Sequence, residues 1–207
     1  MKEPVITNLF PIPIYKTELE RNLTNEEINF AVKEKKHCNK NEGNINTKDS
    51  YILNRPELRN LKIFLEEHCK NYLHTIICPS DKIELYITQS WLNYTETNQY
   101  HHKHEHPNSV VSGTFYFDAD EDTDQIMFTS PRGYQLMSPT VNKEKFNVWN
   151  SETWWLPVKT GELYMFPSST THQVVTKKGN NTRISLAFNT FYKGRIGSNR
   201  NLTELIL

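Results

Sequence analysis

The chain has 207 residues, and its 24 Lys and Arg balance 24 Asp and Glu, so the formal net charge is zero. Such a length can bury a core without disulfides, and we expect one domain over residues 1–207. Zero net charge argues against nucleic acid as a partner. The cysteines are odd in number and lack CxxC spacing, which indicates a reducing compartment, and no apolar run reaches the ~20 residues that span a bilayer. We therefore expect a cytoplasmic protein with no membrane partner.

Residues 1–80 are predicted to form an N-terminal arm followed by helices. Two prolines interrupt the apolar segment 9–15, which is typical of an edge strand or an extended arm. Thr24 and Glu27 have the spacing of a capping box, which predicts a helix of two to three turns after them. Segment 37–50 has no apolar period, and we expect an exposed loop there.

A long amphipathic helix is the clearest element of this N-terminal part. Pro56 suits the first turn of a helix, and apolar residues recur at steps of three and four from Leu58 to Ile76. The helix should end before Pro79 and pack its apolar stripe on a sheet.

From Lys82 onward the apolar period changes from 3.6 to 2, which indicates strands. The predicted strands cover residues 82–91, 109–117, 125–129, 161–167, 171–176 and 183–192. We expect the last two to form a hairpin across 177–181. Strands without intervening helical periods predict an antiparallel sandwich or barrel over about 81–193, with a C-terminal tail over 194–207. The long polar segment 134–151 is predicted to be a functional loop, for instance a lid.

Four of the eight histidines lie in segment 100–107. Neutral imidazole is the commonest metal ligand, and side chains at positions i and i+2 of an extended segment point to the same side. Either His104 with His106, or His102 with His104, could therefore bind one ion, and His172 is the candidate for the third ligand. A histidine-rich surface loop that binds no metal is the competing interpretation.

The last predicted strand has one apolar and one polar face. Alternation places Arg183, Ser185 and Ala187 on the same side, and the predicted hairpin would bring His172 to that side as well. A metal-bound imidazole near a guanidinium and a hydroxyl can hold an anion that also reaches the metal. Asn93 and Tyr116 could line the same space, although packing is the simpler explanation for each.

Several ordered segments carry a family resemblance. They are His104-x-His106-Pro107-Asn108-Ser109, Ser112-Gly113-Thr114-Phe115-Tyr116, Gly161-Glu162-Leu163, Phe166-Pro167-Ser168 with His172, and Arg183-Ile184-Ser185 with Phe188-Asn189. Over about residues 86–192 the chain resembles the 2-oxoglutarate/Fe(II)-dependent oxygenase family of bacteria and phages. The resemblance implies a mainly β (α+β) fold with a double-stranded β-helix (jelly-roll) core and N-terminal helices packed on one sheet. It also implies one Fe(II), the co-substrates 2-oxoglutarate and O₂, and a bacterial or phage-infected host cytoplasm.

The resemblance assigns roles by position: metal ligands His104, His106 and His172, and 2-oxoglutarate contacts Arg183 and Ser185. The wider superfamily usually has His-x-Asp/Glu upstream, whereas both upstream positions here are histidine. Glu105 cannot replace the acid, because its side chain points away from both neighbours on an extended segment. Either an all-histidine site binds Fe(II) more weakly, or a carboxylate from elsewhere completes it. The register His102/His104 remains an alternative.

The implied activity is that of a dioxygenase, in the form of a hydroxylase, which converts 2-oxoglutarate to succinate and CO₂. Its substrate would be an unidentified small molecule or protein side chain. One alternative is a cupin-type three-histidine metalloenzyme, which has no particular use for Arg183-x-Ser185. The other is a non-catalytic β-sandwich that serves as a binding or structural module. The proline-bearing N-terminal edge could also serve as the contact of a homodimer.

Overall fold

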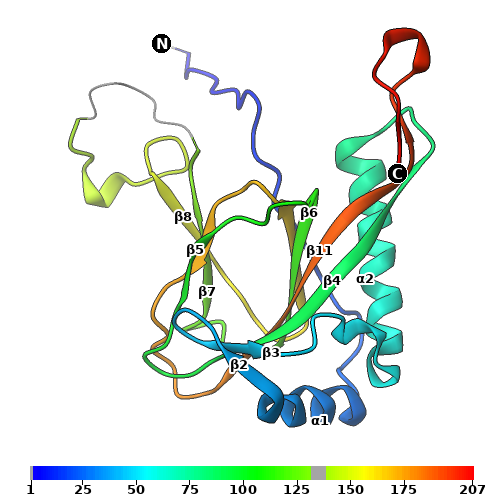
Figure 1. Cartoon of the computed structure of the whole chain (residues 1–207). Coiled ribbons are helices and arrows are strands. Elements are labelled where there is room, and N and C mark those ends of the chain that lie inside the picture. Colours follow the sequence, from blue (N-terminus) through cyan, green and yellow to red (C-terminus); the bar gives the residue numbers. More distant parts are fainter. Residues whose placement is uncertain (1, 132–138) are drawn as a thin grey trace.

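A computed structural model describes residues 2–131 and 139–207 (Figure 1). The helices are α1 (Asn25–Glu34) and α2 (Arg59–Tyr72). The strands are β1 (Tyr15–Glu18), β2 (Cys38–Lys40), β3 (Ile45–Thr47), β4 (Ile83–Thr95), β5 (His101–His104), β6 (Val111–Asp118), β7 (Gln125–Thr129), β8 (Thr153–Pro157), β9 (Glu162–Pro167), β10 (His172–Val174), β11 (Arg183–Ile196) and β12 (Leu205–Ile206). The chain is therefore mainly β, as predicted.

Two antiparallel sheets form the core of the fold. The large sheet has the order β1-β9-β6-β11-β4-β3-β2, with β12 paired to β11, and the small sheet has the order β5-β10-β7-β8. The two sheets enclose the interior between them in a jelly-roll arrangement, which confirms the predicted fold class (Figure 1). In the described part of the chain, no helix is long and apolar enough to cross a membrane.

Helix α1 begins at the predicted capping box. The Glu27 amide donates to Thr24 Oγ1 at 3.2 Å, and the Thr24 amide donates to Glu27 Oε2 at 2.8 Å. Arg21 donates to both carboxylate oxygens of Glu27, at 2.6 and 2.8 Å. Burial raises the pKa of Glu27, but the hydrogen bonds from Arg21 and Thr24 lower it more, so the net pKa lies below 4.5. The ionised carboxylate therefore anchors the chain where it enters α1.

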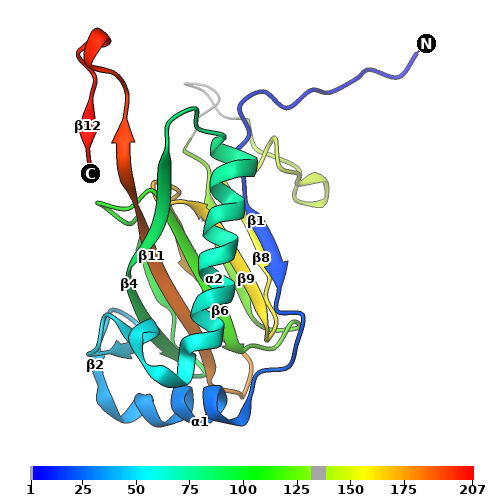
Figure 2. The same ribbon diagram turned by 90° about the vertical axis from the view of Figure 1, so that its right-hand side faces the viewer.

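Helix α2 covers the outer face of the large sheet (Figure 2). A 3₁₀ turn (Pro56–Leu58) precedes it, and a π-helical turn (Leu73–Ile77) follows it, so the predicted helix is present with irregular ends. Its buried residues pack in one cluster with large-sheet residues, among them Leu61, Leu65, Phe115, Leu163 and Leu186. Each fully buried side chain of this kind contributes roughly 1.5–3 kcal/mol. The outer face is thus occupied by helix packing, and the opposite face is left for the interior.

Strand β11 shows this division most clearly. Ile184 and Leu186 belong to the cluster under α2, whereas Arg183 and Ser185 line a pocket between the sheets. The predicted alternation of an apolar and a polar face is confirmed.

The predicted hairpin between β10 and β11 is wrong. Strand β10 pairs with β5 and β7, and β11 pairs with β4 and β6, so the connection crosses from the small to the large sheet. Lys177 secures this crossing: its buried ammonium lies 3.1 Å from Asp124 Oδ1 and 2.7 Å from Asn181 Oδ1. Gly179, which suggested a hairpin turn, accepts a hydrogen bond from Thr97 instead. A buried ion pair therefore decides a connection that turn residues alone mispredict.

Two further predictions need correction. Segment 37–50 is not a plain loop, because β2 and β3 form a small hairpin that adds to the edge of β4. Strand β8 was missed; its polar face and two tryptophans conceal the alternation, and pairing with β7 stabilises it. The predicted loop 134–151 lies partly outside the described residues, and its described part contains the 3₁₀ turn Lys143–Lys145.

Candidate active site

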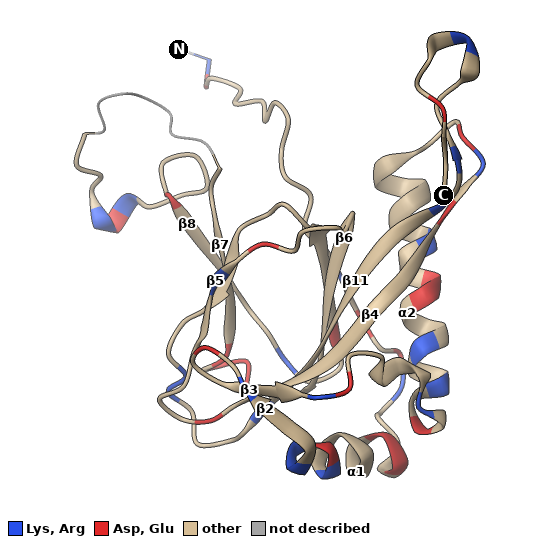
Figure 3. Cartoon of the chain, viewed as in Figure 1, with Lys and Arg blue, Asp and Glu red and all other residues tan. Residues whose placement is uncertain are grey.

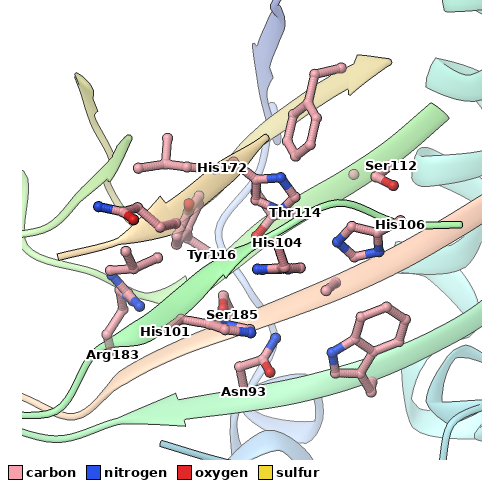
Figure 4. A pocket seen from close by; sticks show the side chains of 17 residues that line it. Asn93, His101, His104, His106, Ser112, Thr114, Tyr116, His172, Arg183 and Ser185 are labelled. Carbon is pink, nitrogen blue, oxygen red and sulfur yellow. The ribbon is translucent and has the colours of Figure 1, made fainter. Parts of the chain in front are cut away.

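A pocket between the two sheets collects most of the residues singled out from the sequence (Figure 4). The small sheet contributes His104 and His172, which are direct partners in the β5–β10 ladder. His106 lies just beyond the end of β5, where its amide donates to the Ser168 carbonyl at 3.0 Å. The antiparallel pairing thus brings together imidazoles that are far apart in the sequence.

His104, His106 and His172 converge on a common point. One ligand nitrogen from each lies within 4.8 Å of the other two. The ring centroids are 4.3 Å apart for His104 and His172, 4.9 Å for His104 and His106, and 5.1 Å for His106 and His172. Because zinc-like ions bind imidazole nitrogen at about 2.1 Å, two ligands of one ion lie up to about 4 Å apart. Small side-chain adjustments would bring all three nitrogens to one ion.

Hydrogen bonds orient these three rings. His104 Nδ1 and His172 Nδ1 each donate to the backbone carbonyl two residues earlier, at 2.8 and 2.9 Å. The His106 ring interacts with the Asn189 side chain, and its Nε2 is buried without a hydrogen-bond partner in the described part of the chain. Metal-binding histidines commonly have one ring nitrogen held in this way. The arrangement therefore leaves Nε2 of each ring as the nitrogen for a ligand.

Burial keeps the three imidazoles neutral. Burial, with a smaller contribution from the neighbouring His104, lowers the pKa of His172 to about 3 and that of His106 to about 4. The pKa of His104 is also lowered, mainly by burial. At pH 7 the lone pairs are therefore available without the loss of a proton.

The alternative pair His102 and His104 also belongs to a cluster, with His101 rather than His172 as its third member. Ligand nitrogens of His101, His102 and His104 lie within 4.8 Å of one another. His104 has only one nitrogen left after its backbone hydrogen bond, so it can serve one cluster at a time. His104, His106 and His172 all line the pocket that also contains Arg183, whereas His102 does not line it. The position of the pocket therefore favours His104, His106 and His172.

No carboxylate joins either cluster within residues 2–131 and 139–207. Glu105 accepts a hydrogen bond from the Thr171 hydroxyl at an exposed position, so its side chain points away from the triad, as expected. Imidazole donors suit divalent iron, nickel, copper and zinc. The residues present thus fit a first-row metal ion as an all-histidine site.

Arg183 is a buried cation with spare donors. Its side chain is 2% exposed, and Nη2 donates to Thr95 Oγ1 at 3.1 Å. Its Nε and Nη1 have no partner in the described part of the chain, and no described carboxylate forms an ion pair with it. Asp124, the acid that acts on it electrostatically, is already bonded to Lys177. Because an uncompensated buried charge costs several kcal/mol, this guanidinium is suited to an anionic ligand.

Polar neighbours surround this arginine in the pocket (Figure 4). Ser185 pairs with Asn93 on β4 and with Tyr116 on β6, and all three line the pocket. Asn93 Oδ1 is buried without a described partner, so packing alone does not account for Asn93. His101 also lines the pocket, and its ring stacks on that of His104 with the ring centroids 4.6 Å apart. No sequence pattern separates it from the other histidines of the cluster.

Comparisons agree with this geometry. Residues 89–189 match the family described as "Putative 2OG-Fe(II) oxygenase". The epimerase SnoN, solved with Fe³⁺, alpha ketoglutarate and nogalamycin RO, is 12% identical, with 94% of this chain and 86% of that chain covered and a TM-score of 0.64. HygX from Streptomyces hygroscopicus, solved with nickel, 2-oxoglutarate and hygromycin B, is 8% identical, with 86% and 82% covered and a TM-score of 0.57.

A prolyl-4-hydroxylase from Pseudomonas putida is 10% identical, with 86% of this chain and 92% of that chain covered and a TM-score of 0.53. No curated protein sequence matches the chain. The fold is the jelly roll (double-stranded β-helix) of these solved structures. The family-model match over residues 89–189 and these solved structures indicate a 2OG-Fe(II)-dependent oxygenase, an oxidoreductase, and the predicted resemblance is confirmed.

Proposed function

We propose that this oxygenase binds Fe(II) through His104, His106 and His172 and binds 2-oxoglutarate through Arg183 and Ser185. Its reaction would combine a substrate C–H bond, O₂ and 2-oxoglutarate to give a hydroxylated product, succinate and CO₂. The observation that carries the proposal is a buried guanidinium, without a carboxylate partner among the described residues, in the same pocket as three neutral imidazoles. Fe(II), when bound, supplies the redox chemistry that activates O₂ and decarboxylates the oxo-acid.

In this proposal the protein residues bind 2-oxoglutarate and orient it toward the metal site. Nε and Nη1 of Arg183 have no partner among the described residues, and either of them, together with the second hydrogen of Nη2, can donate side by side to one carboxylate, which is the geometry that guanidinium favours. Ser185 adds a hydroxyl on the same face of β11, and Asn93 lies opposite it on β4. A dicarboxylate held at Arg183 would direct its other end toward the histidines, since both groups line one pocket.

The similar structures support the proposed metal ion and 2-oxoglutarate more strongly than they support hydroxylation as the reaction. HygX and SnoN were solved with a metal ion and 2-oxoglutarate, which supports the same ligands for this fold. A prolyl-4-hydroxylase is among them, but so are an epimerase and a carbocyclase. Product analysis must therefore separate hydroxylation from another oxidation.

Two measurements test the proposal. Anaerobic titration of 2-oxoglutarate into Mn(II)-loaded protein should show stoichiometric binding, and aerobic incubation with Fe(II) should release CO₂ from 1-¹⁴C-labelled 2-oxoglutarate. Metal binding without oxo-acid binding would instead support the cupin-type three-histidine enzyme. Absence of metal binding would support a non-catalytic module.

A further inference from the structure

A second, larger groove lies at the edge of the jelly roll. Residues 7–14 of the N-terminal arm form one wall, and residues 148–156 at and before β8 form the other. Its volume is about 690 Å³, within the roughly 300–1,000 Å³ range typical of small-molecule sites. Strands β1 and β8 are the outermost strands of the two sheets on this side (Figure 2). The groove therefore opens between the sheet edges and is separate from the histidine pocket.

Aromatic side chains dominate the groove. Phe10, Phe128, Trp149 and Trp154 line it together with aliphatic residues, and the Trp149 and Trp154 side chains remain 43% and 37% exposed. The Trp149 indole donates to Asn8 Oδ1 at 2.7 Å, which links the two walls. An exposed aromatic surface of this kind marks a binding site more often than a solvated face.

The inner end of the groove borders the candidate metal ligands. Phe128 pairs directly with His172 in the β7–β10 ladder, and their rings lie 6.5 Å apart. Thr170, another lining residue, provides the carbonyl that orients the His172 ring. A molecule that filled the groove would thus lie beside His172.

The charge of the groove limits what can bind. Glu152 is the only charged residue among the described residues that line it, and no described Lys or Arg does so. Figure 3 shows β7 and β8 as largely uncharged, with charged residues concentrated on the helices and loops. A carboxylate beside aromatic faces attracts a cation, because ring faces carry partial negative charge. An anionic molecule would meet repulsion from Glu152 with no compensating cation among the described lining residues.

We propose that this groove binds the substrate, and that the substrate is a small molecule with an apolar ring system and a positively charged amine. The rings would stack on Trp154 and Trp149, and the ammonium would lie near Glu152. The assignment of the ligand as substrate rests on the proposed function, whereas its chemical class rests on the groove alone.

Calorimetry with two probes tests the chemical class in metal-free protein. The probes 2-(1-naphthyl)ethylamine and 1-naphthaleneacetate share a ring and differ in the sign of their charge. We expect the amine to bind roughly tenfold more tightly than the acid. Glu152→Gln should remove most of this preference, and Trp154→Ala should weaken amine binding roughly tenfold.

Trp155→Ala is the matched control, because this neighbouring ring is 48% exposed and does not line the groove. Equal affinity for both probes, or equal effects of the two tryptophan variants, would overturn the proposal.

A second measurement tests the position beside the metal ligands. With Mn(II) bound at the histidines, the proton resonances of the bound naphthyl amine should broaden, and His172→Ala should remove the broadening. Normal probe binding without broadening, in protein shown to bind Mn(II), would overturn the role as substrate site. Failure to bind Mn(II) would instead contradict the proposed metal ligands and leave the calorimetric result to decide the chemical class.

Discussion

Replacement of Arg183 by methionine tests the proposed co-substrate site most directly. Methionine keeps similar length and burial but removes the charge and all the donors. The two unpartnered nitrogens of Arg183 are available for charge-assisted hydrogen bonds, each worth about 1.5–3 kcal/mol. Because such contributions are not fully additive, we expect a loss of about 3 kcal/mol, which corresponds to roughly 100-fold weaker binding of 2-oxoglutarate.

The same substitution should leave the ligand-free protein intact. It removes one hydrogen bond, from Nη2 to Thr95, which contributes about 1 kcal/mol. It also removes the desolvation cost of a cation that is 2% exposed and has no described carboxylate partner. The free energy of unfolding in urea should therefore fall by no more than about 1 kcal/mol, and it should rise if the relieved desolvation cost exceeds the lost hydrogen bond.

Anaerobic calorimetry on Mn(II)-loaded protein measures the affinity, and urea unfolding of the ligand-free protein measures the stability. Arg183→Lys serves as the control, because lysine keeps the charge but lacks the two-pronged donor geometry, so its affinity should be intermediate. A large loss of stability with unchanged 2-oxoglutarate affinity would refute the reasoning, since Arg183 would then be a structural residue.

Three further predictions concern the metal, the pH dependence and the core. His172→Ala should abolish stoichiometric metal binding, whereas His102→Ala should retain it; the reverse result in equilibrium dialysis would identify the alternative cluster. The folded-state pKa of Glu27 is lowered, so its contribution to stability is complete above the unfolded-state value and is lost as the pH falls through the folded-state pKa. Unfolding between about pH 6 and pH 3 should therefore depend less on pH in Glu27→Gln, and equal slopes would contradict this account. Leu65→Ala on α2 should lower the unfolding free energy by about 2–5 kcal/mol, while Ile63→Ala, at a position 55% exposed, should change it by about 0.5 kcal/mol at most; similar losses would mean that α2 does not pack as described.

Local patterns in the sequence were sufficient for the elements whose causes are local. The capping box of Thr24 and Glu27 predicts α1, because both hydrogen bonds join residues three positions apart. Alternation in residues 183–188 likewise predicts the two faces of β11, since side chains on a strand alternate by geometry. The same logic selected His104, His106, His172, Arg183 and Ser185 as candidates, and all of them line one pocket.

Local sequence patterns did not predict which distant segments pair with each other. The hairpin prediction placed His172 beside β11, whereas the ladder places it beside His104 and across the interior from Arg183. The reason is that strand partners depend on long-range contacts, such as the buried ion pair of Lys177 and Asp124, which carry no local signature.

The sequence by itself therefore determined the mainly β class, the helix boundaries to within a turn and the chemical identity of the candidate ligands. Only the tertiary structure decided which nitrogens are free, that Arg183 has no carboxylate partner among the described residues, and that an aromatic groove meets His172. Hydrogen-bond satisfaction and cavity shape arise from segments that meet only after folding, whereas residue type and periodicity are properties of the chain itself.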